Sequence, residues 1–422
     1  MKFKKTTLKN GLRVITVPMK DNPTVTVLVL VEAGSKYETK QENGLSHFLE
    51  HMCFKGTIKR PRTIDISREL DGLGAHYNAF TGHESTAYYA KAEAKHFPKL
   101  LDIVSDIYLN STFPEAEMER EKGVIIEEIN MYEDMPQRRV QDLFMELLYG
   151  DQPAGWNIAG TRENVKSFTR NDFTSYKDKT YVASATTIVV AGNIDEALVK
   201  KEIIKTFAHI PVRTKAKKIK VKESQLKPQV LLSYKKTDQA HFVLGVRSFD
   251  LYDKKNPIIS VIATILGGGM SSRLFQKLRE EMGVGYYVYS YNDALTDHGV
   301  FQVSAGVDTT RIHEVVSVIL CELSKLATEK ISEIELKKVK DYMVGSMKLS
   351  LESSDDIANF FGGQEIVHKE LQTIKDIEKK IRAITVQDIQ MLAKKLFVDK
   401  SLNFAVIGPY EDSTSFSKIL KF

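Results

Sequence analysis

The sequence predicts an α+β protein made of two homologous domains. Three observations support this: a length of 422 residues, segments that repeat at an offset near 215 residues, and strand-like runs that mix with long amphipathic helices. At roughly 100–200 residues per domain, the length allows two to four domains. Because strands and helices do not alternate regularly, we expect mostly antiparallel sheets covered by helices on one face, rather than a doubly wound parallel sheet.

The composition is close to the average for globular proteins, with 42% hydrophobic and 27% charged residues, which excludes disordered and collagen-like chains. A net charge of +5 gives no reason to expect nucleic acid as a partner. Apolar runs such as 27–31 are too short to span a bilayer, so no membrane association is expected. The basic residues 1–5 precede no apolar signal core, and the two cysteines, Cys53 and Cys321, are too few for a disulfide framework. We therefore expect a cytoplasmic protein.

Two independent pairs of segments support an internal duplication. Residues 172–192 and 388–408 both start a helix at an Asp and end a strand at a Gly, at an offset of 216. The pairs Tyr37-Glu38 and Tyr252-Asp253 repeat at an offset of 215. Coincidence between ordinary helix–strand units is the alternative, but two matching offsets favour duplication.

A basic segment poor in large apolar residues separates the halves and is typical of a solvated linker. We accordingly predict domains at 1–212 and 229–422 joined by a linker at 213–228. Within the first half, strands are expected at 25–31, 85–92 and 186–190, and amphipathic helices at 95–110 and 115–131.

The segment His47-Phe48-Leu49-Glu50-His51 lies in a stretch, 43–54, with helical spacing. Residues four apart share one face of a helix, so His47 and His51 can reach the same ion, with Glu50 on the flank. Two imidazoles suit zinc, which in catalytic sites has a third protein ligand and a bound water of lowered pKa. Glu50 is placed to take a proton from that water. The alternative is a pair of surface or core histidines on an ordinary helix.

A third ligand must come from another element, and the helix expected at 115–131 is acidic. Glu121 and Glu128 are seven apart, two turns along one face of that helix. Such a stripe facing inward would need a cation, because buried carboxylates are costly without one. A solvated acidic face is the alternative reading.

The motif HxxEH is the inverted zinc signature, and the whole chain resembles the pitrilysin/insulinase family of zinc metallopeptidases. It is most similar to the short members, which include processing-peptidase subunits. The resemblance implies one zinc per chain held by His47, His51 and Glu128, the last being 77 residues after the second His. It also implies that Glu50 is the general base, and that Glu121, seven residues before Glu128, supports the site without binding the metal.

The resemblance extends to substrate binding. Asn78, Ala79 and Phe80 match the family's active-site edge strand, which would pair with the backbone of an extended peptide. An ordinary edge strand is the alternative. In the second half, Arg279 and Tyr286 match an Arg/Tyr pair that faces the zinc and binds substrate carbonyls.

Two alternatives bear on this second-half signature. For Arg279 the alternative is a helix salt bridge with a neighbouring Glu. Tyr287 and Tyr289 lie close to Tyr286, so the choice of Tyr286 rests on its spacing from Arg279. The glycines at 267–269 are not followed by the Lys-Ser/Thr of a phosphate-binding loop, which argues against nucleotide binding.

The second half carries no equivalent metal site. At the repeat offset of 218, Glu121 corresponds to Val339 and Glu128 to Ser346. The resemblance therefore implies a clam-shell in which the second domain faces the zinc. It also implies an endopeptidase that cuts short unfolded peptides, or leader and processing substrates, inside an enclosed chamber. A homodimer is expected, with a heterodimer with a homologous subunit as the alternative, and a non-catalytic structural subunit is the rival function. Cys53 is either inert core or a site of oxidant sensitivity.

Overall fold

The computed structural model describes residues 2–367 and 370–422 and contains two sheets. The described chain forms two compact units, neither of which is continuous in sequence. The first comprises residues 1–130, 156–219 and 350–371, and the second comprises 131–155, 220–349 and 372–422. These units differ from the continuous domains expected at 1–212 and 229–422, because a helix of each half packs on the sheet of the other.

The first unit is built on a six-stranded sheet with the order β1-β2-β6-β3-β5-β4. All neighbours are antiparallel except β2 and β6. Its strands are β1 (Lys4–Thr7), β2 (Arg13–Pro18), β3 (Thr24–Val31), β4 (His76–Thr81), β5 (Thr86–Glu93) and β6 (Thr186–Gly192). Strand β4 lies at the edge and pairs, within the described chain, with β5 alone.

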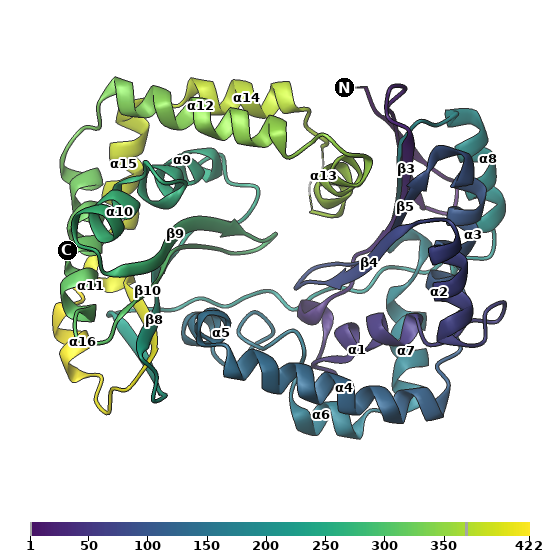
Figure 1. Ribbon diagram of the computed structural model, residues 1–422, viewed down its shortest axis with the longest axis horizontal. Helices are drawn as coiled ribbons and strands as arrows, with labels where there is room; N and C mark the ends of the chain where they lie inside the picture. Colours follow the sequence, from purple (N-terminus) through teal and green to yellow (C-terminus); the bar gives the residue numbers. More distant parts are fainter. Residues whose placement is uncertain (1, 368–369) are drawn as a thin grey trace. The chain divides into compact units, whose positions relative to one another are not determined.

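Helices cover both faces of this sheet. They are α1 (Leu45–Cys53), α2 (Thr63–Gly72), α3 (Phe97–Leu109), α4 (Glu115–Asp134), α6 (Arg162–Ser167), α7 (Arg170–Thr180), α8 (Glu196–Thr206) and α13 (Ser354–Val367). The main core lies between the sheet and helices that include α1, α3 and α7. On the opposite face, α13 lies beside β3 (Figure 1). Its residues Ile357 and Phe361 share a buried cluster with Leu28 and Leu30 of β3. The expectation of helices on one face only is therefore wrong.

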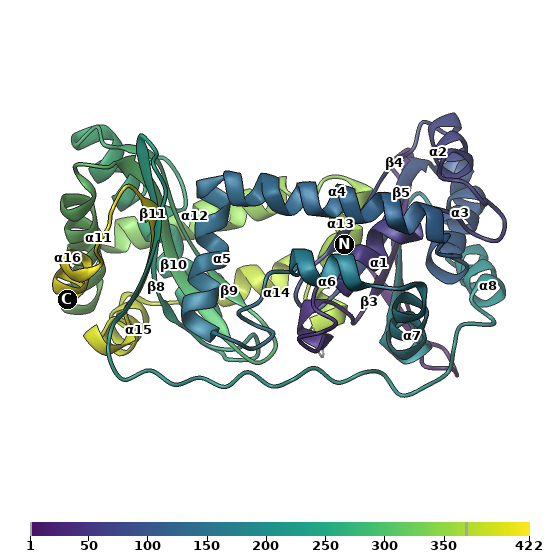
Figure 2. The same ribbon diagram turned by 90° about the horizontal axis from the view of Figure 1, so that it is seen from below.

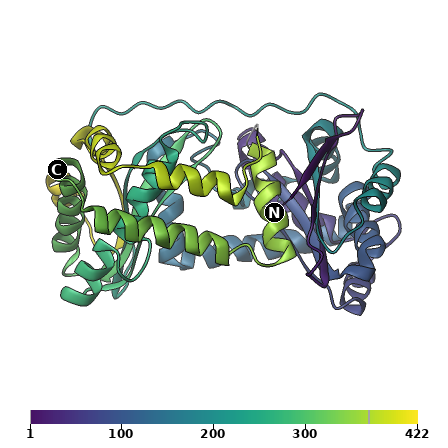
Figure 3. The same cartoon turned by 90° about the horizontal axis from the view of Figure 1, so that it is seen from above.

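The second unit contains a five-stranded sheet with the order β7-β11-β8-β10-β9. Its strands are β7 (Gln229–Tyr234), β8 (Gln239–Arg247), β9 (Gly285–Ala294), β10 (Gly299–Asp308) and β11 (Asn403–Gly408). Its helices are α5 (Pro136–Tyr149), α9 (Asn256–Gly267), α10 (Arg273–Phe275), α11 (Ile312–Thr328), α12 (Glu333–Leu349), α14 (Ile374–Ala383), α15 (Val386–Leu396) and α16 (Thr414–Ile419). Helices α12 and α14 lie side by side (Figure 3). With β1 set aside, both sheets have the same strand order, which agrees with two homologous α+β domains.

The two halves exchange one helix each. Helix α5 follows α4 and packs on the second sheet, where Val140 and Phe144 contact Val243 and Ala405. Helix α13 follows α12 and packs on the first sheet. Because α4 and α12 start 218 residues apart, the exchange follows the same repeat as the strands. Each core thus has a main layer of helices from its own half and a single helix from the other half.

Residues 213–228 contain no helix or strand (Figure 2). They are nevertheless bound along their length: Ser184 donates a hydrogen bond to the carbonyl of Arg213, and the backbone of Lys222 exchanges two hydrogen bonds with Gln152. Across the described ranges, no helix combines the length and apolarity needed to cross a bilayer.

Candidate metal and catalytic site

The helix that carries the HxxEH motif is fixed at its start by a buried carboxylate. Glu38 accepts hydrogen bonds from the backbone N–H groups of Gly44 at 2.9 Å and Ser46 at 2.6 Å. These are donors that the first turn of a helix leaves unpaired, so the carboxylate acts as a cap. Burial raises the pKa of Glu38 to about 6, against the opposing effect of these hydrogen bonds. From the sequence, Glu38 was recognised only as a marker of the repeat.

The same helix buries one face and presents the other to the site. Phe48, Leu49 and Met52 of α1 are fully buried in the core. His47 and His51 lie on the other face with ring centroids 4.7 Å apart, and their side chains are 13% and 22% exposed. The four-residue spacing thus places both imidazole rings on one face of α1.

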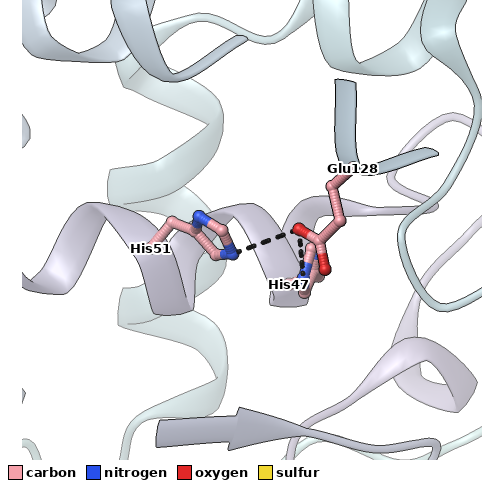
Figure 4. A group of neighbouring side chains, drawn as sticks. All are labelled: His47, His51 and Glu128. Carbon is pink, nitrogen blue, oxygen red and sulfur yellow. Dashed lines mark ion pairs between the residues drawn. The ribbon is translucent and has the colours of Figure 1, made fainter. Parts of the chain in front are cut away.

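Glu128 of α4 points toward both histidines (Figure 4). Its Oε2 atom lies 3.6 Å from Nε2 of His47 and 3.7 Å from Nε2 of His51, and the three ligand atoms lie within 4.8 Å of one another. A tetrahedral zinc ion with bonds of about 2.0–2.2 Å separates its ligand atoms by roughly 3.3–3.6 Å. The two distances from Glu128 are close to this spacing, and two imidazole nitrogens with one carboxylate oxygen are a ligand set that suits zinc.

The pKa values of the two histidines are shifted in opposite directions. Burial, reinforced by the neighbouring His51, lowers the pKa of His47 to about 4, with Glu128 opposing the shift. His47 is therefore neutral at pH 7 and can offer a nitrogen lone pair. Burial also works to lower the pKa of His51, but the hydrogen bond to Glu121 and the charges of Glu50, Glu121 and Glu128 outweigh it, so this pKa is raised.

Glu121 holds His51 from the side away from Glu128. Its carboxylate, 6% exposed, lies 2.9 Å from Nδ1 of His51 and 2.6 Å from Nζ of Lys55. Burial works to raise the pKa of Glu121, yet hydrogen bonds from His51 and Lys55 outweigh burial and lower it. A carboxylate on Nδ1 directs Nε2 toward the ligand cluster. Lys55 was not identified from the sequence; it lies two residues beyond the end of α1, in the bend that follows the helix.

Glu50 is bound to the end of the edge strand. Its Oε2 accepts a hydrogen bond of 2.5 Å from the hydroxyl of Thr81, the last residue of β4. Burial raises the pKa of Glu50. The hydrogen bond from Thr81 and the charge of His51 oppose this shift, and the charge of Glu128 adds to it. A carboxyl group with a raised pKa is suited to accept and return a proton near neutral pH. The role of Thr81 as a partner of Glu50 was missed.

The residues expected to bind substrate lie on β4 and in the second unit. Asn78 and Phe80 are exposed and Ala79 is half-buried, an alternation that follows the strand, and one edge of β4 has no strand partner among the described residues. Arg279 lies in a π-helical turn, Gln276–Glu281, and donates from Nη1 to the carbonyl of Tyr286 at 2.8 Å. Within the described chain Arg279 forms no ion pair, while the neighbouring Glu281 pairs with Lys277.

Cys53 is fully buried at the end of α1, and the hydroxyl of Tyr88 donates to its sulfur at 3.4 Å. This environment favours the inert reading of the thiol over oxidant sensitivity, because reactive cysteines are partly exposed.

The chain is similar to known peptidases in sequence and in fold. Residues 13–162 match the family described as Insulinase (Peptidase family M16), and residues 167–343 match the Peptidase M16 inactive domain. An uncharacterized zinc protease of Bacillus subtilis is 35% identical to this chain, and the match covers 96% of this chain and 98% of the relative. An uncharacterized zinc protease of Streptomyces coelicolor is 33% identical, and the match covers 97% of this chain and 90% of the relative. A protease from Helicobacter pylori has the same fold, with a TM-score of 0.92 at 24% identity over 97% of this chain and 99% of its own.

Proposed function

The chain belongs to the insulinase family of peptidases, peptidase family M16, and from this premise we propose that it is a zinc-dependent endopeptidase. Its substrates are short unfolded peptides, or leader and processing substrates. The observation that carries the proposal is the convergence of His47, His51 and Glu128, with Glu50 beside them and hydrogen-bonded to Thr81.

Each residue has a defined task in this proposal. His47, His51 and Glu128 hold one zinc ion, and Glu121 orients His51 through Nδ1. Zinc bound by these residues would act as a Lewis acid, which would polarise the scissile carbonyl and lower the pKa of water. Glu50 takes the proton of the attacking water and returns it to the nitrogen of the leaving amine. The hydroxyl of Thr81 fixes the carboxylate of Glu50 in the orientation for both transfers.

The substrate binds as an added strand on β4. Asn78, Ala79 and Phe80 offer main-chain groups along the edge that has no strand partner in the described chain. Main-chain pairing recognises an extended conformation with little demand on sequence. Arg279 and Tyr286 bind substrate carbonyls. Among the described residues, His47, His51 and Glu128 are the group of side chains that could hold a metal ion, which supports one zinc per chain.

The proposal also covers assembly and compartment. Two copies of the chain form a homodimer that encloses the reaction, with pairing to a homologous subunit as the alternative. Both cysteines are free thiols, which agrees with a reducing compartment such as the cytoplasm. A non-catalytic subunit of the same fold is the rival function, and the presence of all five histidine and glutamate positions argues against it.

The test combines metal analysis with peptide cleavage. The purified protein should contain one zinc per chain and cut unstructured peptides, and a chelator should abolish cleavage. Glu50→Gln should lower kcat by about 100-fold or more with zinc retained. Glu128→Gln should lose zinc, whereas Glu127→Gln, an exposed neighbour on α4, should keep both zinc and activity. Full activity in Glu50→Gln, or a metal-free wild-type protein that still cleaves peptides, would overturn the proposal.

A further inference from the structure

A buried ion pair links the two elements that carry the candidate site. Glu84 lies in the turn between β4 and β5 and is 7% exposed, and its Oε1 is 3.2 Å from Nζ of Lys36. Lys36 is fully buried in the segment that precedes α1. Removing one partner of a buried pair leaves an uncompensated charge, so this pair holds the turn and the segment together.

The backbone reinforces this connection. The N–H of Lys36 donates a hydrogen bond of 2.9 Å to the carbonyl of His83. The N–H of Ser35 donates a hydrogen bond of 3.3 Å to the carbonyl of Gly82. A Cβ atom on Gly34 would lie only 2.3 Å from the carbonyl oxygen of Gly82. The segment and the turn therefore approach as closely as a glycine permits.

Each side of this connection positions a part of the site. The turn begins directly after Thr81, whose hydroxyl binds Glu50. The segment ends at Glu38, which caps the helix that carries His47 and His51. A shift of the turn relative to the segment would move Thr81 relative to Glu50 and displace the end of strand β4.

A second cation on Glu84 comes from the segment that joins the two units. Lys218 forms an ion pair with the same Oε1 atom of Glu84, and its side chain is 19% exposed. Its neighbour Lys217 is exposed and has no ion pair among the described residues. Three residues after Lys218, the N–H of Val221 is bound to Asp297 in the second unit. The joining segment is thus attached to the turn beside the site.

We propose that Lys218 is a positioning residue for peptide hydrolysis. Its ammonium group compensates the carboxylate of Glu84 and fixes the β4–β5 turn, and through the turn it holds Thr81 and the substrate-binding strand in place. This inference rests on the proposed peptidase function, but it concerns a residue outside the metal ligands and the general base.

The main test compares Lys218→Met with Lys217→Met. Methionine keeps a long flexible side chain and removes the charge. Both variants lose one ammonium group, but only Lys218→Met loses an ammonium group that contacts Glu84, so Lys217→Met is the control. We expect kcat/KM per bound zinc to fall about fivefold in Lys218→Met, with zinc content unchanged, and to stay at the wild-type value in Lys217→Met. Lys218→Arg should restore it.

Hydrogen exchange gives a readout that does not depend on activity. Amides of residues 76–86 should exchange faster in Lys218→Met than in Lys217→Met, because the turn has lost one of its anchors. A double-mutant cycle with Glu84→Gln should be non-additive, since Lys218 acts through Glu84.

The outcomes separate this inference from the proposed function. Equal kcat/KM and equal exchange in the two lysine variants would overturn the role of Lys218 and leave the peptidase intact. Additive effects in the cycle would overturn the route through Glu84. A zinc-loaded wild-type protein that cleaves no peptide would overturn the proposed function, and this inference with it.

Discussion

Glu121 of α4 and His51 of α1 link the two helices of the metal site, with Oε1 of the carboxylate 2.9 Å from Nδ1 of the imidazole. The other oxygen of Glu121 lies 2.6 Å from Lys55, so the carboxylate is held from both sides. Removing this support should weaken metal binding and leave the ligand set intact. We expect Glu121→Gln to lower zinc affinity by about 10–100-fold, measured by competition with a chelating dye. Glu119→Gln, on the exposed side of the same helix, should have wild-type affinity.

The hydroxyl of Thr81 should be required for the function of Glu50. Thr81→Val keeps the shape of the side chain and removes the hydrogen-bond donor. A hydrogen bond to a charged group contributes about 1.5 kcal/mol, so its loss should lower kcat roughly tenfold. That bond stabilises the charged carboxylate and lowers the pKa of Glu50, so its loss raises the pKa further. The acid limb of the pH–rate profile should therefore move to higher pH. Thr81→Ser, which retains the hydroxyl, should behave as wild type; a Val variant with unchanged kcat and profile would contradict this role.

Glu38 should make the protein less stable as the pH rises. Its folded-state pKa, about 6, is above the ordinary value of 4.5, so the folded chain binds the proton more tightly than the unfolded chain. Stability from this group is present below pH 4.5 and is lost as the pH rises through 6, by about 2 kcal/mol in total. Glu38→Gln removes this titration. When the free energy of unfolding is measured with denaturant, the variant should gain about 2 kcal/mol relative to wild type between about pH 4.5 and 7. A difference in free energy of unfolding that stays constant over this pH range would contradict the prediction.

Two glycines should respond in opposite ways to alanine. Gly44, at the start of α1, has φ of 101°, and a Cβ atom there would lie 2.6 Å from the carbonyl oxygen of Ala159. Gly44→Ala should therefore destabilise the protein by about 2 kcal/mol or more. Gly123 lies within α4, and apart from the helix's own backbone no atom lies within 4 Å of an added Cβ, so Gly123→Ala should stabilise the protein by about 0.5–1 kcal/mol. Thermal unfolding of the two variants distinguishes these effects.

Local sequence patterns anticipated much of this structure. The helix expected at 115–131 is α4, Glu115–Asp134, and the strand expected at 25–31 is β3, Thr24–Val31. The i, i+4 spacing of His47 and His51 and the seven-residue spacing of Glu121 and Glu128 are properties of a single helix each. Such patterns can be read from a sequence because they depend on helix geometry alone.

The contacts that were missed join residues far apart in the chain. Thr81 and Glu50 are 31 residues apart, Glu84 and Lys36 are 48 apart, and Lys218 and Glu84 are 134 apart. Each of these contacts joins two ordinary polar side chains that the fold brings together. The local sequence around either side chain therefore shows no unusual pattern. The second layer on each sheet was missed for the same reason, because nothing in the local sequence of α5 or α13 indicates which of the two sheets the helix packs on.

The exchange of α5 and α13 makes the two halves of the chain dependent on each other. A fragment that ends at residue 212 would retain the metal ligands but lack α13, and would expose the apolar side chains of β2 and β3, including Ile15, Val17, Leu28 and Leu30, that α13 covers. The complementary fragment would lack α5 and leave Val243 and Ile407 uncovered. Exposed apolar surfaces of this kind promote aggregation. The two halves are thus not separable modules, and a chain divided at the joining segment would give two polypeptides that each leave an apolar sheet face uncovered.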